Sequence, residues 1–373
     1  MLSLYLFETY LTKNSIKPEI NKAEIIKKKI NYDSRSKFEF YNDMIANDKN
    51  ITVTVAPIKF NDPDKKIHFL SGISNSKTID CNENGYYSSY LSDRFGFNNP
   101  NDQWDNKIIQ YVLLGDSFTH GACVNRPNDI ASQLRILSKN KVINLGYKAN
   151  GPLSMLATLK EYMPRKSRNV LWLYFEGNDL SDLKSELKNE ILIKYYFDEN
   201  YRQNLRFKQK LIDQINQKIM SESIKLEDRI VQQAIKNSEI KNKILKFIRL
   251  NETKKALSLI FIKQKKKELP IEEFKNIIKS VKKYTENNNS KLHFIYLPQF
   301  ERYKKRFSNL RYDQIKKIIE DLNINFIDLN QGVFLKQEDP LALFPFKMWG
   351  HYNEEGYKKV AYYIYENLKQ SVD

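Results

Sequence analysis

The sequence predicts a three-layer α/β sandwich built on a parallel sheet of five strands. Short, continuous apolar segments alternate along the chain with longer segments in which apolar residues recur at helical spacing. This alternation is typical of a buried parallel sheet with helices on both faces. The chain has 373 residues, of which 41% are hydrophobic, and only 11 Gly and 11 Pro. It can therefore bury a core and is neither fibrous nor broadly disordered.

Five short apolar segments are the candidate strands. They are residues 108–114, 141–145, 169–175, 291–297 and 324–329. Amphipathic patterns that predict helices lie between and after them. They cover residues 127–138, 152–163, 271–287, 312–322 and 353–370. Because a parallel neighbour is reached only through a long crossover connection, this order favours a parallel sheet.

Residues 1–107 precede this alternation and predict an N-terminal extension of irregular and β structure. Short alternating segments, such as 51–57 and 66–70, are separated by turn-rich segments. The first eleven residues are apolar but carry Glu8 and lack the basic segment and cleavage site of a signal peptide. They fit a core segment or the remainder of a longer membrane anchor. No run of about 18 apolar residues, as a membrane span needs, occurs in the chain.

Residues 182–269 interrupt the alternation. They contain no candidate strand, only long helical patterns rich in Lys, Gln, Ile and Leu. We expect an inserted helical subdomain or lid there. The predicted α/β core is thus split into residues 108–181 and 270–373.

The charge balance is strongly basic. The chain has 62 Lys and Arg against 45 Asp and Glu, a net charge of +17, which suits an anionic partner. No nucleic-acid-binding motif or interleaved basic and aromatic pattern accompanies the charge, so we expect no nucleic-acid partner. An anionic membrane surface or an acidic polysaccharide fits the basic surface better.

Two cysteines, Cys81 and Cys123, are present. They could form one disulfide, but two unrelated buried thiols are the expected arrangement. A structural zinc site needs clustered Cys or His residues, which the sequence lacks. We therefore expect no metal site and no cofactor.

The strongest signal for chemistry is the segment 112–121, VLLGDSFTHG. An apolar strand ends at Gly115 and Asp116, and Ser117 follows directly. Ligands of open parallel sheets bind at the carboxyl ends of the strands, so Ser117 is expected to face a cleft. Taken alone, the segment fits an ordinary Asp-Ser turn equally well.

Four short segments, taken together, resemble the blocks of the SGNH (GDSL-like) hydrolase family. In chain order they are Gly115-Asp116-Ser117, residues 144–152 (NLGYKANGP), Glu176-Gly177-Asn178-Asp179 with its Gly displaced by one position, and Gly350-His351-Tyr352-Asn353. The resemblance extends over residues 108–373 except for the helical insertion. It implies a flavodoxin-like sheet and acyl-transfer chemistry.

The resemblance also implies the roles of the site residues. Ser117 would be the nucleophile and His351 the base that takes its proton, because the pKa of His suits that transfer near neutrality. The side-chain amide of Asn178 and the main-chain N–H of Ser117 would stabilise the oxyanion, each donor contributing on the order of 3 kcal/mol. Ala149 stands where the family supplies a third N–H from Gly, and it can do so unless the backbone requires a positive φ.

The acid that orients the histidine departs from the family pattern. Family members usually carry an Asp three residues before the His, and Met348 occupies that position. Three replacements are open: Asp339 folding back, a main-chain carbonyl near Met348, or a dyad of reduced activity. Asp339 is the favoured one, although Asp-Pro is also ordinary turn chemistry.

Four other residues near the blocks are candidates for the substrate pocket. His120 follows the nucleophile by three positions and fits either a substrate contact or a loop position. Gly177 and Asp179 flank Asn178 and could shape the acyl or leaving-group pocket. Asp116 is a further candidate, although in such a turn Asp most often bonds nearby main-chain N–H groups.

These features predict a serine esterase that hydrolyses an O-acyl ester, acetyl above all, on a carbohydrate through a Ser117 acyl-enzyme. The N-terminal extension resembles that of bacterial envelope-associated members, which implies a periplasmic or envelope location, membrane-anchored if residues 1–11 end an anchor; a cytoplasmic location stays open. An O-acyltransferase is the alternative that shares every named residue. A non-catalytic scaffold that binds a glycan or a protein is the alternative of another class. The sequence does not indicate the oligomeric state.

Overall fold

The computed structural model describes residues 32–57, 67–236, 269–304, 307 and 311–369. The chain divides into two units, one of residues 39–220 with 269–373 and the other of residues 1–38 with 221–268. The first unit contains both sheets and all residues of the candidate site, and the following description concerns that unit.

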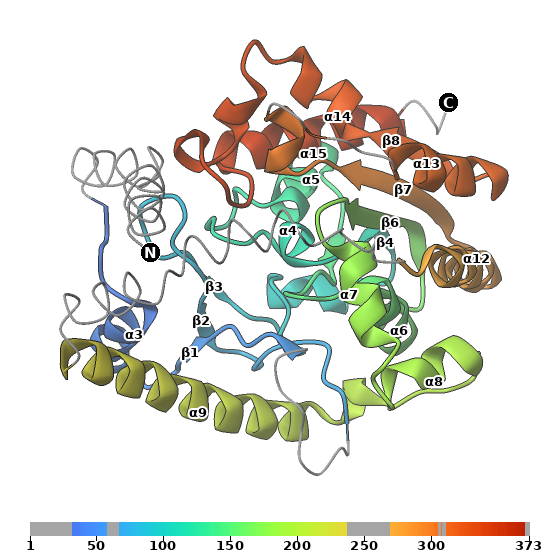
Figure 1. The fold of residues 1–373 in the computed structure, drawn as a ribbon. Coiled ribbons are helices and arrows are strands. Elements are labelled where there is room, and N and C mark those ends of the chain that lie inside the picture. The colour runs from blue at the N-terminus through green and yellow to red at the C-terminus, as the bar shows by residue number, and fades with distance from the viewer. Residues whose placement is uncertain (1–31, 58–66, 237–268, 305–306, 308–310, 370–373) are drawn as a thin grey trace, which may run out of the picture. The chain divides into compact units, whose positions relative to one another are not determined.

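The larger sheet has five parallel strands. They are β4 (Ile109–Leu114), β5 (Val142–Asn144), β6 (Ser167–Phe175), β7 (Lys291–Leu297) and β8 (Asn325–Asp328). Their order across the sheet is β5-β4-β6-β7-β8, and each neighbouring pair is parallel (Figure 1). Counted from β4, this is the flavodoxin-like order 2-1-3-4-5. The predicted five-stranded parallel sheet is confirmed.

Helices cover both faces of this sheet (Figure 1). One face carries α6 (Pro152–Tyr162), α12 (Ile271–Asn287) and α13 (Tyr312–Asp321), and the other α5 (Ile130–Ser138) and α15 (Glu354–Lys369). Successive side chains of β4 alternate between the faces, so Val112 and Leu114 pack with the first group of helices while Tyr111 and Leu113 pack with the second. The predicted three-layer sandwich is confirmed.

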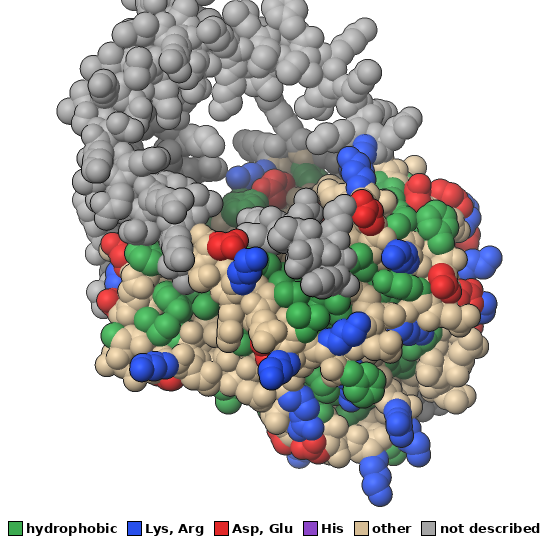
Figure 2. Space-filling model, turned by 90° about the horizontal axis from the view of Figure 1, so that it is seen from below, with side chains coloured by type: hydrophobic (Ala, Val, Ile, Leu, Met, Phe, Trp, Pro, Cys, Tyr) green, Lys and Arg blue, Asp and Glu red, His purple; other side chains and the backbone are tan. Residues whose placement is uncertain are grey.

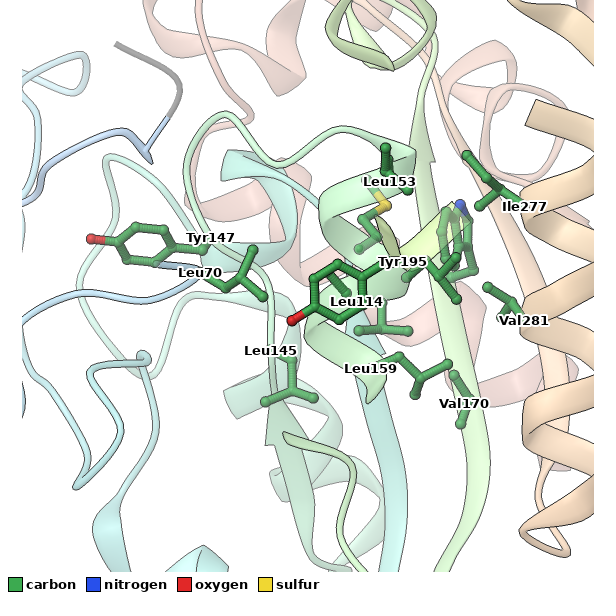
Figure 3. Close-up of a cluster of buried hydrophobic side chains, with 14 of the residues drawn as sticks. Leu70, Leu114, Leu145, Tyr147, Leu153, Leu159, Val170, Tyr195, Ile277 and Val281 are labelled. Atoms are coloured by element: carbon green, nitrogen blue, oxygen red, sulfur yellow. The ribbon is translucent and has the colours of Figure 1, made fainter. Parts of the chain in front are cut away.

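Figure 3 shows part of the first hydrophobic cluster. Leu114 and Val170 come from the sheet, Leu159 from α6 and Ile277 from α12, and all four are buried. Burial of several such side chains between sheet and helix is the main source of stability here, at about 1.5–3 kcal/mol for each fully buried side chain. The rigid sheet that results carries the candidate site at its carboxyl edge.

A smaller sheet lies in the N-terminal extension. Strand β1 (Ile51–Val53) pairs in parallel with β2 (Lys77–Ile79), which pairs antiparallel with β3 (Ser89–Leu91). Residues 67–70, which the alternation predicts as part of a strand, form none; all four are buried, so no alternation in burial exists there. The helix α3 (Lys37–Ile45) precedes β1.

Helices occupy the described part of the region predicted as an insertion. They are α7 (Asp179–Glu186), α8 (Leu192–Phe197), the 3-10 helix η3 (Leu205–Phe207) and α9 (Gln209–Lys236). Leu183, Tyr195 and Ile212 join the same hydrophobic cluster as the sheet. Residues 237–268 of the predicted insertion lie outside the described residues. Among the described residues, no helix combines the length and apolar character needed to cross a bilayer.

Short helices complete the described chain. They are α4 (Ser117–His120), α14 (Leu329–Gly332), and the 3-10 helices η2 (Asn101–Asp105), η4 (Phe300–Tyr303), η5 (Phe334–Lys336), η6 (Pro340–Leu343) and η7 (Pro345–Lys347). The first of them follows β4 directly and bears the predicted nucleophile.

Candidate active site

Ser117 is the first residue of a one-turn helix at the carboxyl end of β4. Asp116 caps this helix, because its Oδ1 accepts the main-chain N–H of Phe118 at 2.9 Å. Gly115 makes the sharp turn between strand and helix possible, since a Cβ there would lie 1.9 Å from the Oγ1 of Thr119. The turn sets Ser117 at the sheet edge, where ligands of parallel sheets bind.

His351 contacts the hydroxyl of Ser117. Its Nε2 lies 2.8 Å from the Ser117 Oγ, within hydrogen-bond reach of the proton it would take. The imidazole also packs on the ring of Phe118, with ring centres 4.7 Å apart. Two of the residues that the sequence predicted as catalytic are therefore side by side, although 234 positions separate them.

The third member of the array is Glu83, which lies between β2 and β3 in the N-terminal extension. Its Oε1 and Oε2 are 3.0 and 3.1 Å from the Nδ1 of His351, and Oε2 also accepts the main-chain N–H of His351 at 2.6 Å. Burial raises the pKa of Glu83, but the hydrogen bonds and charge of His351 outweigh it, so the pKa lies below its ordinary value. Glu83 is thus a carboxylate that fixes the imidazole with Nε2 toward Ser117.

Asp339 does not take this position, which corrects the prediction. It caps η6, where its Oδ1 accepts the main-chain N–H of Leu341 at 3.0 Å, and its Oδ2 lies 2.7 Å from the Nζ of Lys347. The Asp-Pro pair therefore has the turn role that its composition also allowed. The Nδ1 of His351 contacts Glu83. The histidine is therefore not oriented by a main-chain carbonyl near Met348, and the site is not a dyad without an acid.

A disulfide joins the Glu83 loop to the segment after α4. Cys81 and Cys123 are bonded, which corrects the expectation of two unrelated thiols. The Cys123 Sγ lies 3.7 Å from the Nδ1 of His351, and the side-chain amide of Asn84 donates to the carbonyl of Cys123 at 3.0 Å. The loop that carries Glu83 is thus covalently tied to the α/β core beside the histidine.

The disulfide also bears on metal binding. Among the described residues, the one group of three potential metal ligands in close approach is Cys81, Cys123 and His351, whose ligand atoms lie within 4.8 Å of one another. A metal would need thiolates, and both sulfurs are in the disulfide. In this oxidised state the group therefore does not offer a metal site.

Two main-chain N–H groups are available to an oxyanion. Within the described residues, the N–H groups of Ser117 and Ala149 donate to no protein acceptor. Ala149 has a φ of +59°, so the condition under which Ala replaces Gly freely is not met. A left-handed conformation costs a non-glycine residue about 1–2 kcal/mol, and such strain is typical of functional loops.

Asn178 precedes α7 and is held by Asp182. Its Nδ2 donates to the Asp182 Oδ2 at 2.8 Å, which leaves the second amide hydrogen for another acceptor. Burial, followed by the charges of Glu186 and Asp116, raises the pKa of Asp182 to about 7. Sequence reasoning missed Asp182, although its position four residues after Asn178 at a helix start was an available signal.

Two predicted pocket residues, Asp116 and Asp179, are fully buried and hold the backbone instead of lining an open surface. The Asp179 Oδ2 accepts the main-chain N–H of Phe175 at 3.0 Å. Burial raises the pKa of Asp116 to about 6 against the hydrogen bond from Phe118. Burial, together with the charges of Asp116 and Asp182, raises the pKa of Asp179 well above its usual range.

The other two predicted pocket residues differ from each other. His120 is fully buried and packs edge-on against the rings of Tyr90 and Tyr147, at 4.8 and 5.6 Å, so it is a core residue and does not line an open surface. Gly177 is exposed next to Asn178. The preceding Glu176 forms an ion pair with Arg302, which anchors this loop to η4, the 3-10 helix that follows β7.

Comparisons with known proteins find similarity only to solved structures at low sequence identity. No protein-family model matches the sequence, and no curated protein matches it. Solved structures similar to the chain include a lipolytic protein of the G-D-S-L family from Desulfitobacterium hafniense DCB-2, at 17% identity over 70% of this chain and 99% of that one, with a TM-score of 0.38.

Two further similar structures are an acetyl xylan esterase and an acetyl-xylooligosaccharide esterase. The first, AlAXEase, is 12% identical over 70% of this chain and all of that one (100%), with a TM-score of 0.36. The second, from Geobacillus stearmophilus, is 15% identical over 70% of this chain and 95% of that one, with a TM-score of 0.37. At these identities and TM-scores the similarity indicates neither the activity nor the substrate of this chain.

Proposed function

We propose that this protein is a serine esterase of the SGNH type, with Ser117 as nucleophile, His351 as general base and Glu83 as the acid that orients it. The observation that carries the proposal is the hydrogen-bonded line from Glu83 to His351 Nδ1 and from His351 Nε2 to Ser117 Oγ, with distances of 3.0 and 2.8 Å. Such a line is the arrangement that activates a serine hydroxyl.

The reaction follows from this geometry. His351 Nε2 takes the proton of Ser117 as Oγ attacks the ester carbonyl, and the oxyanion is stabilised by the N–H groups of Ser117 and Ala149 and by the amide of Asn178. The intermediate collapses when the C–O bond to the alcohol breaks and His351 returns the proton to the alcohol. Water, activated by the same histidine, then releases the acid and restores Ser117.

The substrate is proposed to be an O-acyl ester, acetyl above all, on a carbohydrate of the cell envelope. This rests on the resemblance of the extended N-terminal region to envelope-associated members of the family. A location outside the cytoplasm is supported by the Cys81–Cys123 disulfide, because disulfides persist in oxidising compartments. The non-catalytic alternative loses its main support, since it rested on a missing acid.

The test uses a fluorophosphonate probe and p-nitrophenyl acetate on the full chain. The natural protein should be labelled and should turn over the ester, whereas Ser117→Ala should show no labelling and turnover lower by about 10⁴-fold or more. Ser280→Ala on α12 is the matched control and should behave as the natural protein. Labelling or turnover that survives in Ser117→Ala would refute the role of Ser117.

Acetylated oligosaccharides then test the substrate class. Mass spectrometry should find free acetate and a deacetylated sugar when the natural protein is supplied with the substrate. If an added sugar acceptor becomes acetylated instead, the protein is an O-acyltransferase and the hydrolytic proposal is wrong. If only p-nitrophenyl acetate is cleaved, the carbohydrate class is wrong while the esterase proposal stands.

A further inference from the structure

A recess lined by cations lies at the edge of the large sheet opposite to Ser117. It has a volume of about 540 Å³ and includes Ile109, the first residue of β4. Ser117 lies beyond the other end of that strand, whose six residues from Ile109 to Leu114 span about 17 Å at about 3.3 Å per residue. We call this feature, defined by Lys107, Arg165, Lys166 and Arg206 together with Phe207, the basic recess.

The charges of the basic recess are not neutralised by the protein. None of its lining residues is acidic, and among the described residues none of its four cations forms an ion pair with a carboxylate. Nearby carboxylates are engaged elsewhere, Asp105 with Arg94 at 2.8 Å and Asp102 with Lys141 at 3.8 Å. Figure 2 shows Lys and Arg side chains scattered among hydrophobic and polar ones on the face that it draws. A concave group of unpaired cations attracts an anion.

Arg206 is held in place before any ligand arrives. Its guanidinium lies 5.0 Å above the ring of Phe95 and 5.3 Å above that of Trp104, which also lines the recess. The indole Nε1 of Trp104 in turn donates to the Oδ2 of Asp93 at 2.7 Å. A guanidinium fixed in this way presents its fork of N–H groups to a carboxylate or phosphate with little loss of freedom.

Phe207 adds an apolar surface to the basic recess. Its side chain is 87% exposed at the rim of the recess. An exposed aromatic face beside cations suits a ligand with both an apolar face and a negative charge, as a sugar ring with an acidic group has. The volume is that of a small-molecule site, so the concave shape fits one or two sugar units better than the surface of a bilayer or a long track of nucleic acid.

We propose that the basic recess binds an anionic sugar unit, carrying a carboxylate or phosphate, of the polymer on which the ester site acts. The carbohydrate nature of this ligand rests on the proposed function, whereas the recognition of an anion rests on the recess alone. Because the recess lies far from Ser117, it holds a different part of the polymer from the one being deacylated.

The test measures binding of defined polymers to the full chain by calorimetry at low salt. Oligogalacturonate supplies carboxylates, phosphomannan supplies phosphates, and neutral mannan is the uncharged control. At least one anionic polymer should bind, with an affinity that falls steeply with salt, and should bind Lys107→Glu/Arg165→Glu/Lys166→Glu at least tenfold more weakly. All three side chains are exposed, so the triple variant should fold.

A matched variant separates the recess from net charge. Lys279→Glu/Lys317→Glu/Lys358→Glu makes the same change of charge at exposed positions on α12, α13 and α15, and it should bind within about twofold of the natural protein. Three results would overturn the proposal. The first is an equal loss of affinity in the two variants, and the second is no binding of either anionic polymer. The third is a loss of affinity in the recess variant that is seen only when anionic vesicles or DNA are the ligand. Turnover of p-nitrophenyl acetate should be unchanged in both variants. If the natural protein shows no turnover, the esterase proposal is refuted, while the binding measurement still tests the recess.

Discussion

The candidate site is assembled from two regions that differ in how they hold their residues. Ser117 and Asn178 follow strands of the large sheet directly, and His351 precedes α15, so these three residues are positioned by the α/β core. Glu83 comes instead from a loop between two three-residue strands, and a disulfide from Cys81 ties that loop to the core. The core thus carries the proposed nucleophile and base, and the extension carries the carboxylate that contacts the base. The extension is therefore part of the candidate site.

The core region should show the largest effect when a residue is removed. We expect His351→Ala to lower kcat for p-nitrophenyl acetate by about 10⁴-fold or more, because the serine hydroxyl loses its base. Circular dichroism should show an unchanged fold, since His351 is partly exposed. A variant that keeps a tenth of the natural rate would remove His351 from the mechanism.

Asp182 should act on the rate through Asn178. Asn178→Ala removes an oxyanion donor and should lower kcat by about 10²–10³-fold, and Asp182→Asn should lower it by about 10-fold or more with KM little changed. The Asp182 carboxylate accepts the hydrogen bond from the Asn178 Nδ2 and has no donor of its own. It therefore holds the amide nitrogen of Asn178, and not the amide oxygen, in its present place.

The double variant Asn178→Ala/Asp182→Asn distinguishes this role from a structural one. It should be no slower than Asn178→Ala alone, because the interaction that Asp182 makes has already been removed. Effects that multiply in the double variant would mean that Asp182 acts independently of Asn178.

The link between the two regions should have an intermediate effect. Cys81→Ser/Cys123→Ser frees the Glu83 loop, and we expect turnover to fall by about tenfold while labelling of Ser117 by the fluorophosphonate persists. The sequence separation of 42 residues corresponds to about 4 kcal/mol in the chain-entropy description, or a fall in Tm on the order of 5 °C. Unchanged kinetics with a lowered Tm would show that the disulfide supports the fold without positioning Glu83.

The smallest effect concerns the stability of the core region as a function of pH. An unfolded Asp ionises near 3.8, whereas the pKa of Asp182 in the folded chain is about 7. Between these values the folded state binds more protons than the unfolded state, so this group lowers the stability as pH rises. Asp182→Asn removes that dependence. Its Tm relative to the natural protein should therefore be higher at pH 8 than at pH 5, and an equal difference at both pH values would contradict the shift.

The core part of the site could be predicted because local patterns mark it. Ser117 and Asn178 each follow a short apolar strand, and the topology of a parallel sheet brings strand ends together whatever their separation in sequence. His351 was found through the block that precedes its helix. The strand order itself was implied by the resemblance and agrees with the structure.

Glu83 could not be predicted in the same way. It stands 268 positions from His351 within the segment Asn82-Glu83-Asn84-Gly85, whose composition indicates only a turn. Its partner is set by how the small sheet of the extension packs on the core, which no local pattern encodes. The positive φ of Ala149 could not be predicted either, because the loop around it imposes a conformation that alanine itself disfavours.

The central claim is that the N-terminal extension supplies the acid of the site. Steady-state turnover of p-nitrophenyl acetate by Glu83→Gln and by Asp339→Asn tests it in one assay, because each change replaces a carboxylate by an amide of similar shape. We expect Glu83→Gln to lower kcat by about 10³-fold or more, and Asp339→Asn to stay within about twofold of the natural protein. A Glu83→Gln variant within tenfold of the natural rate, or an Asp339→Asn variant that falls as far, would contradict the claim.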